Sequence, residues 1–78
     1  MAGINLGSIK KIEKERYSIH DKVLTTFSAF IVNGKKYIQF DMFGNSNRKN
    51  TGKVSQILQI DKETAIFFTN LFKKEFNL

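Results

Sequence analysis

Three aromatic residues, Phe30, Tyr37 and Phe43, lie in one short stretch of the chain together with Gln39. This combination suggests a surface that binds a ligand. Flat aromatic rings stack on unpaired bases, and an amide can donate and accept hydrogen bonds at a base edge. The same rings could instead support one another as cross-strand pairs beneath the N-terminal segment. The residues alone favour neither role, so both stand as hypotheses.

The dipeptide Asn33-Gly34 predicts how these side chains are positioned. Asn and Gly readily adopt the positive φ that a two-residue type I′ hairpin requires at both central positions. The flanking residues 22–32 and 35–43 are rich in β-branched and aromatic side chains, which favour strands. We therefore predict an antiparallel hairpin whose register is fixed by its turn.

That register sorts the side chains onto two faces, because neighbours along a strand point to opposite sides. One face is predicted to carry the pairs Phe30–Tyr37, Ser28–Gln39, Thr26–Asp41 and Leu24–Phe43, with Val32 opposite Lys35. It mixes aromatic and polar side chains, so we expect it to meet solvent or a ligand. The other face is predicted to carry Ile31–Lys36, Ala29–Ile38, Phe27–Phe40 and Thr25–Met42. It is mostly apolar and is expected to form the core.

The positive charge is concentrated in the part of the chain that should form the sheet. The whole chain has 13 Lys+Arg and 7 Asp+Glu, a net charge of +6. Residues 1–60 carry all of this excess (10 − 4 = +6), whereas residues 61–78 are neutral (3 − 3 = 0). A basic surface attracts phosphate and releases counterions from nucleic acid. The basic residues expected to contact phosphates are Lys10, Lys11, Lys35, Lys36, Arg48, Lys49 and Lys53.

Two further segments complete the predicted sheet. Apolar residues alternate within residues 4–16, but their parity changes around Gly7-Ser8, which a strand bent by a bulge would explain. Residues 44–52 contain no large apolar side chain and predict a loop, and residues 53–60 alternate as a strand. The expected fold is α+β, a single domain over residues 1–78 with a four-stranded antiparallel curved sheet followed by one C-terminal amphipathic helix.

The helix is predicted over residues 64–76. Asp61 is a suitable N-cap, Glu63 favours the first turn, and the Lys73-Lys74 pair suits the C-terminal end of the helix dipole. Its apolar residues span roughly half the circumference, wider than the stripe of about 100° that packs on one core. A deep groove in a curved sheet would cover this surface, or a second copy would cover part of it. On the second hypothesis the homodimer interface comprises Phe67, Leu71 and Leu78.

Several classes of protein are disfavoured by what the chain contains. The absence of Cys excludes disulfides, thiolate metal sites and cysteine nucleophiles. His20 has no set of nearby metal ligands, and residues 44–52 lack the Gly-Lys-Ser/Thr ending of a P-loop. We expect a non-enzymatic protein with no cofactor and no metal. Without a signal-like N-terminus or a long apolar run, a cytoplasmic protein is the default expectation. The bias toward Lys, Asn, Ile and Phe points to an AT-rich bacterial or phage genome.

The order of these elements resembles the transcriptional coactivator family called Positive Cofactor Four, over about residues 34–76. Residues 37–43 (YIQFDMF) match the family's strand of mixed apolar and aromatic residues, and the polar loop to Gly52 matches its basic, glycine-containing turn. The acidic start at Asp61-Lys62-Glu63 matches the beginning of its helix. Gln39 or Asp41 stands where the family has a basic residue, and the helix has no Trp. The resemblance implies a dimer whose curved sheets hold single-stranded DNA.

The predicted hairpin also looks like the central hairpin of bacterial OB-fold single-stranded-DNA-binding proteins. The similar stretches are residues 25–30 (TTFSAF) and 37–44 (YIQFDMFG). That fold has a fifth strand after its helix, and this chain has no residues after Leu78 to supply one. This resemblance implies the same class of ligand as the first.

The leading hypothesis is therefore a small protein that binds single-stranded DNA or RNA, with bases stacked on Phe30, Tyr37 and Phe43. Gln39 would contact bases, and the Lys and Arg side chains named above would hold phosphates. The alternative is a phage or bacterial interaction module or inhibitor, in which the same aromatic face binds a host protein.

Overall fold

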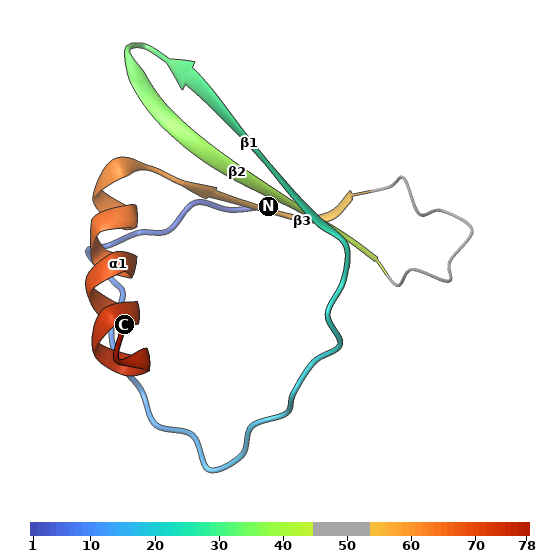
Figure 1. Cartoon of the computed structure of the whole chain (residues 1–78), viewed down its shortest axis with the longest axis vertical. Helices are drawn as coiled ribbons and strands as arrows, with labels where there is room; N and C mark the ends of the chain where they lie inside the picture. Colours follow the sequence, from blue (N-terminus) through green and yellow to red (C-terminus); the bar gives the residue numbers. More distant parts are fainter. Residues whose placement is uncertain (45–53) are drawn as a thin grey trace.

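A computed structural model describes residues 1–44 and 54–78 of the chain. It has an antiparallel sheet of three strands, β1 (Thr25–Val32), β2 (Lys35–Phe43) and β3 (Val54–Ile60), in the order β1-β2-β3. The helix α1 (Lys62–Phe76) follows β3 directly and extends away from one end of the sheet (Figure 1). The fold is therefore α+β, with the strands before a single C-terminal helix.

The Asn33-Gly34 turn has the geometry that the sequence predicts. The φ angles are 53° at Asn33 and 77° at Gly34, both in the left-handed region that a type I′ turn needs. The predicted β1–β2 register is confirmed throughout, from Val32 opposite Lys35 to Thr25 opposite Met42. The turn thus decides which side chains share each face of the hairpin.

The pairing of β2 with β3 contains one irregularity. Ile38 lies opposite Ile60 and Phe40 opposite Leu58, but the register shifts between Met42 and Phe43. Ser55 is the extra residue at this β-bulge, and its hydroxyl donates to the carbonyl of Met42 at 3.0 Å.

The N-terminal segment differs from the prediction, because the described residues 4–16 form no strand. Ala2 alone joins the sheet: its N–H donates to the Ile57 carbonyl, and its carbonyl accepts from the Gln59 N–H, both at 2.9 Å. The change of parity near Gly7 marks a turn, in which the Asn5 side chain accepts from the Gly7 N–H at 3.0 Å. A short polar side chain that bonds its own backbone competes with strand pairing, so the chain turns there instead of bulging.

Both ends of α1 are capped by side-chain and backbone hydrogen bonds. The Asp61 carboxylate accepts from the Thr64 N–H at 2.9 Å, and α1 begins at Lys62, two residues before the predicted start. Asn77 takes the left-handed conformation with φ 58°, and its N–H donates to the Lys73 carbonyl. The pKa of Asp61 is lowered by hydrogen bonds from Thr64, of which the side-chain bond has the larger effect and the backbone bond the smaller.

The described residues contain very little core. Ile60, 7% exposed, is the one buried hydrophobic residue among them, and Thr64 is buried beside it. The apolar face of the hairpin was expected to be the core, yet Phe27 is 74% and Ile31 68% exposed. The reason is that α1 meets the sheet only near its first turn, so most of this face has no element packed on it.

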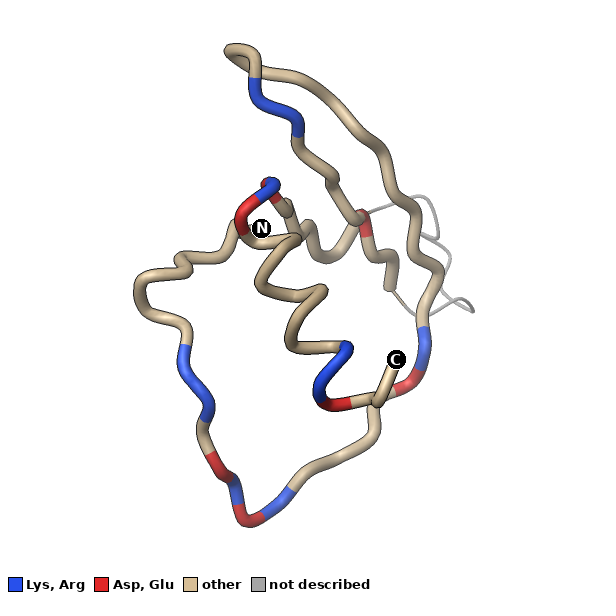
Figure 2. Tube along the Cα trace, turned by 60° about the vertical axis from the view of Figure 1, so that its left-hand side comes forward, with Lys and Arg blue, Asp and Glu red and all other residues tan. Residues whose placement is uncertain are grey.

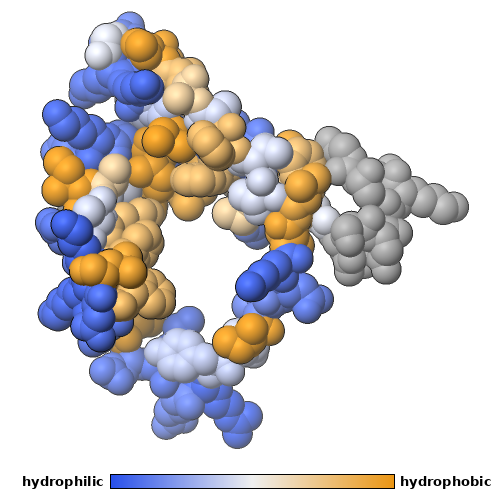
Figure 3. Space-filling view, in the orientation of Figure 1, coloured by the Kyte–Doolittle hydropathy of each residue, from blue (hydrophilic) through white to orange (hydrophobic). Residues whose placement is uncertain are grey.

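The overall dimensions show the same lack of packing. The radius of gyration is 15.0 Å, whereas a compact chain of this length has about 11.5 Å. The chain exposes 7408 Å², whereas a folded protein of its mass exposes about 4,900 Å². Apolar surface borders an opening through the molecule in the space-filling view (Figure 3).

The Asp61 cap predicts a pH-dependent contribution to stability. Because the pKa of Asp61 is lowered in the fold, its ionised form stabilises α1 at neutral pH. We expect Asp61→Asn to lower the thermal midpoint at neutral pH. The difference from wild type should begin to shrink as the pH falls below 3.8, the ordinary pKa of this carboxyl, and should be lost once the pH is below the lowered pKa of the folded state. Thermal melts followed by circular dichroism test this, and a difference that persists in acid contradicts it.

Candidate functional site

Phe30 and Tyr37 form a stacked cross-strand pair on one side of the hairpin. Their ring centroids are 5.4 Å apart and their planes differ by 19°, and both side chains are half-buried. The pair lies close to the turn, because Phe30 and Tyr37 are opposed across the register that Asn33-Gly34 fixes. Two rings held nearly parallel offer a flat apolar surface for a third planar group.

A row of polar side chains crosses the same face beside the ring pair. Gln39 Nε2 donates to Asp41 Oδ1, and Gln59 Nε2 donates to Gln39 Oε1, each at 2.8 Å. These bonds hold the Gln39 amide in one orientation, with its nitrogen toward the carboxylate. We call the surface formed by Phe30, Tyr37, Gln39, Asp41 and Gln59 the aromatic face.

Gln59 belongs to this face, although the sequence does not predict it. The missing information was the pairing of β3 with β2, which places Gln59 opposite Gln39. The alternation of apolar and polar residues over 53–60 predicts a strand with two different faces. It does not show which of these faces continues the aromatic face. The sequence offers no short turn that would fix the register of this pair, because ten residues (44–53) join the two strands.

Phe43 lies at the far end of β2 from the ring pair. It lies six positions after Tyr37, which corresponds to roughly 20 Å along a strand. It is half-buried, lies opposite Val54, and its N–H donates to the Leu24 carbonyl at 2.9 Å. The three aromatic residues therefore lie along one strand pair but do not form one cluster.

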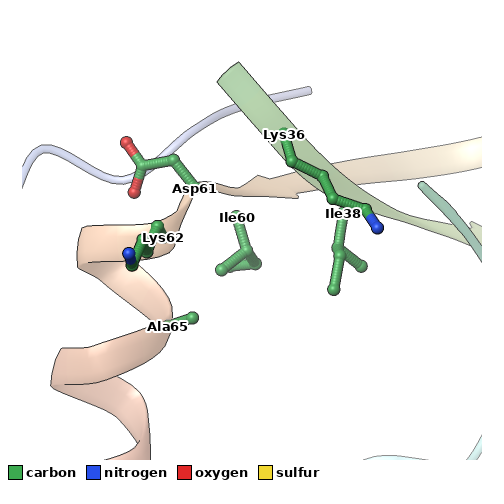
Figure 4. Close-up of a pocket in the computed structure, with 6 residues that line it drawn as sticks. All are labelled: Lys36, Ile38, Ile60, Asp61, Lys62 and Ala65. Carbon is green, nitrogen blue, oxygen red and sulfur yellow. The ribbon is translucent and has the colours of Figure 1, made fainter. Parts of the chain in front are cut away.

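The expected phosphate-binding residues that the structure describes lie on two separate segments, the N-terminal segment and the hairpin (Figure 2). Lys35 and Lys36 follow the hairpin turn and are exposed. Lys36 borders an apolar pocket on the opposite side of the sheet from Tyr37, with Ile38, Ile60 and Ala65 (Figure 4). Alternation along β2 places Lys35 on the side of Tyr37. Arg48, Lys49 and Lys53 lie outside the described residues.

Lys10 and Lys11 lie beside the helix and not beside the aromatic face. With Ile9 and Ile12 they line a cavity of about 590 Å³ whose other wall includes Phe67 and Leu71. Phe67 and Leu71, two of the expected dimer contacts, are thus half-buried next to the N-terminal segment. The third expected contact, Leu78, is 81% exposed.

A row of phenyl rings runs along another side of α1. Phe68 and Phe72 are 5.5 Å apart between centroids, and Phe72 and Phe76 are 6.2 Å apart. Exposure rises along the row, from a half-buried Phe68 to 43% at Phe72 and 70% at Phe76. The phenyl row is therefore most exposed at the end of the helix far from the sheet.

Comparisons with protein-family models, with curated proteins and with solved structures each gave no match. In the part of the chain that the structure describes, every helix is too short or too polar to cross a membrane.

The positive φ at Gly34 predicts that the register depends on this residue. A β-branched side chain at φ 77° is strained even though a Cβ there would meet open space. We expect Gly34→Val to lower the free energy of unfolding by about 1–2 kcal/mol and to disturb the Phe30–Tyr37 pair. Gly44→Ala is the matched control, because its Cβ would also meet open space without a positive φ. Urea unfolding measures both, and equal effects would contradict the account.

Proposed function

We propose that this protein is a non-enzymatic binder of single-stranded DNA or RNA, and that the aromatic face is its ligand surface. The observation that carries the proposal is the stacked Phe30–Tyr37 pair beside the ordered amides of Gln39 and Gln59. An exposed sheet with parallel rings and adjacent amides suits unpaired bases, which present both a flat surface and a polar edge.

The proposed binding mode assigns different parts of the nucleotide to different side chains. Bases stack on Tyr37 and Phe30, and a base further along the strand reaches Phe43. The amides of Gln39 and Gln59 contact base edges. The carboxylate of Asp41 repels phosphate, so the sugar-phosphate backbone follows the side of the sheet nearer Lys35. Lys10, Lys11, Lys36, Arg48, Lys49 and Lys53 attract the parts of a longer strand beyond this face.

We also propose that the protein acts as a homodimer through α1, with Phe67, Leu71 and Leu78 in the interface. The large exposed area supports a second copy, as does the presence of only one buried hydrophobic residue among those described, because a chain of this size is marginally stable even when well packed. The phenyl row of Phe68, Phe72 and Phe76 lies on the adjacent side of α1, and its exposed rings would widen this interface.

The ring pair predicts a loss of affinity when it is removed. Stacking contributes about 1–3 kcal/mol per base, so Phe30→Ala with Tyr37→Ala should weaken binding of fluorescein-labelled oligo-dT about tenfold or more. Tyr17→Ala is the control, because Tyr17 is 71% exposed but lies outside the sheet. Fluorescence anisotropy at low salt measures the affinities, and circular dichroism confirms that the variants are folded.

Two results would contradict the proposed function. The first is no binding of oligo-dT at micromolar protein and low salt, and the second is equal affinity for wild type and the double variant. Recovery of a bacterial protein from lysate that survives nuclease treatment, combined with either result, would favour a protein-interaction module.

The helix surface predicts self-association. Light scattering after size exclusion should give a mass of at least twice the 9.0 kDa of one chain. A charge at the centre of the phenyl row should weaken association about tenfold or more, so Phe72→Glu is the test variant. Asn70→Glu adds the same charge at another exposed position of α1 and should have little effect. A wild-type mass of 9.0 kDa would contradict the dimer.

A further inference from the structure

The strand β1 forms an outer edge of the sheet. It pairs with β2 on one side, and no described residue pairs with its other side (Figure 1). The Phe43 N–H donates to the Leu24 carbonyl, so the even-numbered residues of β1 bond to β2. The backbone groups of Thr25, Phe27, Ala29 and Ile31 therefore point outward from the sheet.

This edge lacks the features that usually prevent a strand from pairing with another chain. Natural edge strands carry Lys, Pro, a bulge or inward-pointing charges. The sequence of β1, TTFSAFIV, has no charged residue and no Pro, and its pairing with β2 has no bulge. On a chain of net charge +6, this neutral edge is a place where two copies can approach without direct repulsion.

We propose that β1 pairs antiparallel with β1 of a second copy, about a two-fold axis at Ser28. In this register Thr25 lies opposite Ile31 of the second copy, and Phe27 lies opposite Ala29. The backbone groups of all four outward-pointing residues then form hydrogen bonds with β1 of the second copy. A shift of two residues in either direction leaves one of the four without a partner, so the register centred on Ser28 is the most favourable.

The side chains also fit this register. The large ring of Phe27, 74% exposed in one chain, falls next to the small Ala29 of the second copy, and Ile31, 68% exposed, falls next to Thr25. On the other side of the sheet Phe30 falls next to Thr26. No like charges meet along the strand, and each exposed apolar side chain of β1 gains a neighbour.

The exposed area is large enough to accommodate this contact in addition to the helix contact. The surface of one chain exceeds the expected value by about 2,500 Å², whereas a standard interface buries about 800 Å² on each partner. The two surfaces are separate, because α1 follows β3 and β1 is the opposite edge of the sheet. Two different two-fold contacts on each chain close into a tetramer when their axes cross at right angles, and this is the assembly that we propose.

Pairing through β1 would join two aromatic faces into one sheet surface of six strands. This consequence concerns the ligand, but the pairing itself rests on the backbone edge and not on the proposed function. Its test therefore contains no nucleic acid, and either hypothesis can fail without the other.

A cysteine at the proposed two-fold axis tests the pairing directly. The chain has no Cys, so Ser28→Cys introduces a single thiol. The two Cα atoms of a pair that is not hydrogen-bonded lie about 4.5 Å apart, within the range that a disulfide spans. We expect rapid disulfide formation across the dimer under mild oxidation. Ser18→Cys, an exposed position in the N-terminal segment, should react at least about tenfold more slowly.

A second variant tests the edge without new covalent chemistry. Ala29→Lys places a charge beside the outward backbone groups and should halve the mass measured by light scattering, whereas Ser18→Lys should leave it unchanged. Combining Ala29→Lys with Phe72→Glu should give a mass of 9.0 kDa. Equal oxidation rates for the two cysteine variants, or an unchanged mass for Ala29→Lys, would overturn the proposal.

Discussion

The two-residue turn at Asn33-Gly34 is the constraint on which the rest of the structure depends. Its positive φ angles bring β1 back along β2 in one register, and a slip of one residue would move every side chain to the other face. The ring pair of Phe30 and Tyr37, the polar row beside it and the outward backbone groups of β1 all follow from that register. One local conformational preference thus sets the candidate ligand surface and the candidate pairing edge.

The second determining property is the shortage of core. One copy buries Ile60 and leaves Phe27, Ile31 and Phe76 largely exposed. Local hydrogen bonds are nevertheless well formed, as the Asp61 cap and the Asn33-Gly34 turn show. The elements are therefore specified locally, while the packing between them is sparse among the described residues. The proposed self-association would supply further packing surfaces from a second copy of the same chain.

The sequence predicts best what short-range chemistry decides. The β1–β2 register follows from Asn33-Gly34, and the helix start follows from Asp61 to within two residues. The prediction of an N-terminal strand is wrong because the Asn5 side chain accepts a hydrogen bond from the Gly7 N–H and forms a turn. The alternation of apolar residues alone does not reveal this bond. Gln59 is missed because strand alternation contains no information on the partner register. The prediction that the apolar hairpin face is buried is wrong for a single copy. A pattern of apolar residues does not show which element, or which copy of the chain, packs against them.

The central claim is that the aromatic face, and not the basic segments alone, binds single-stranded nucleic acid. Titration of the isotope-labelled protein with oligo-dT, followed by amide and side-chain NMR shifts, tests it most directly. The account predicts that the largest changes fall on Tyr37, Phe30 and the side-chain amides of Gln39 and Gln59. Changes confined to the N-terminal segment or to α1, with the ring pair and both amides unmoved, would contradict it.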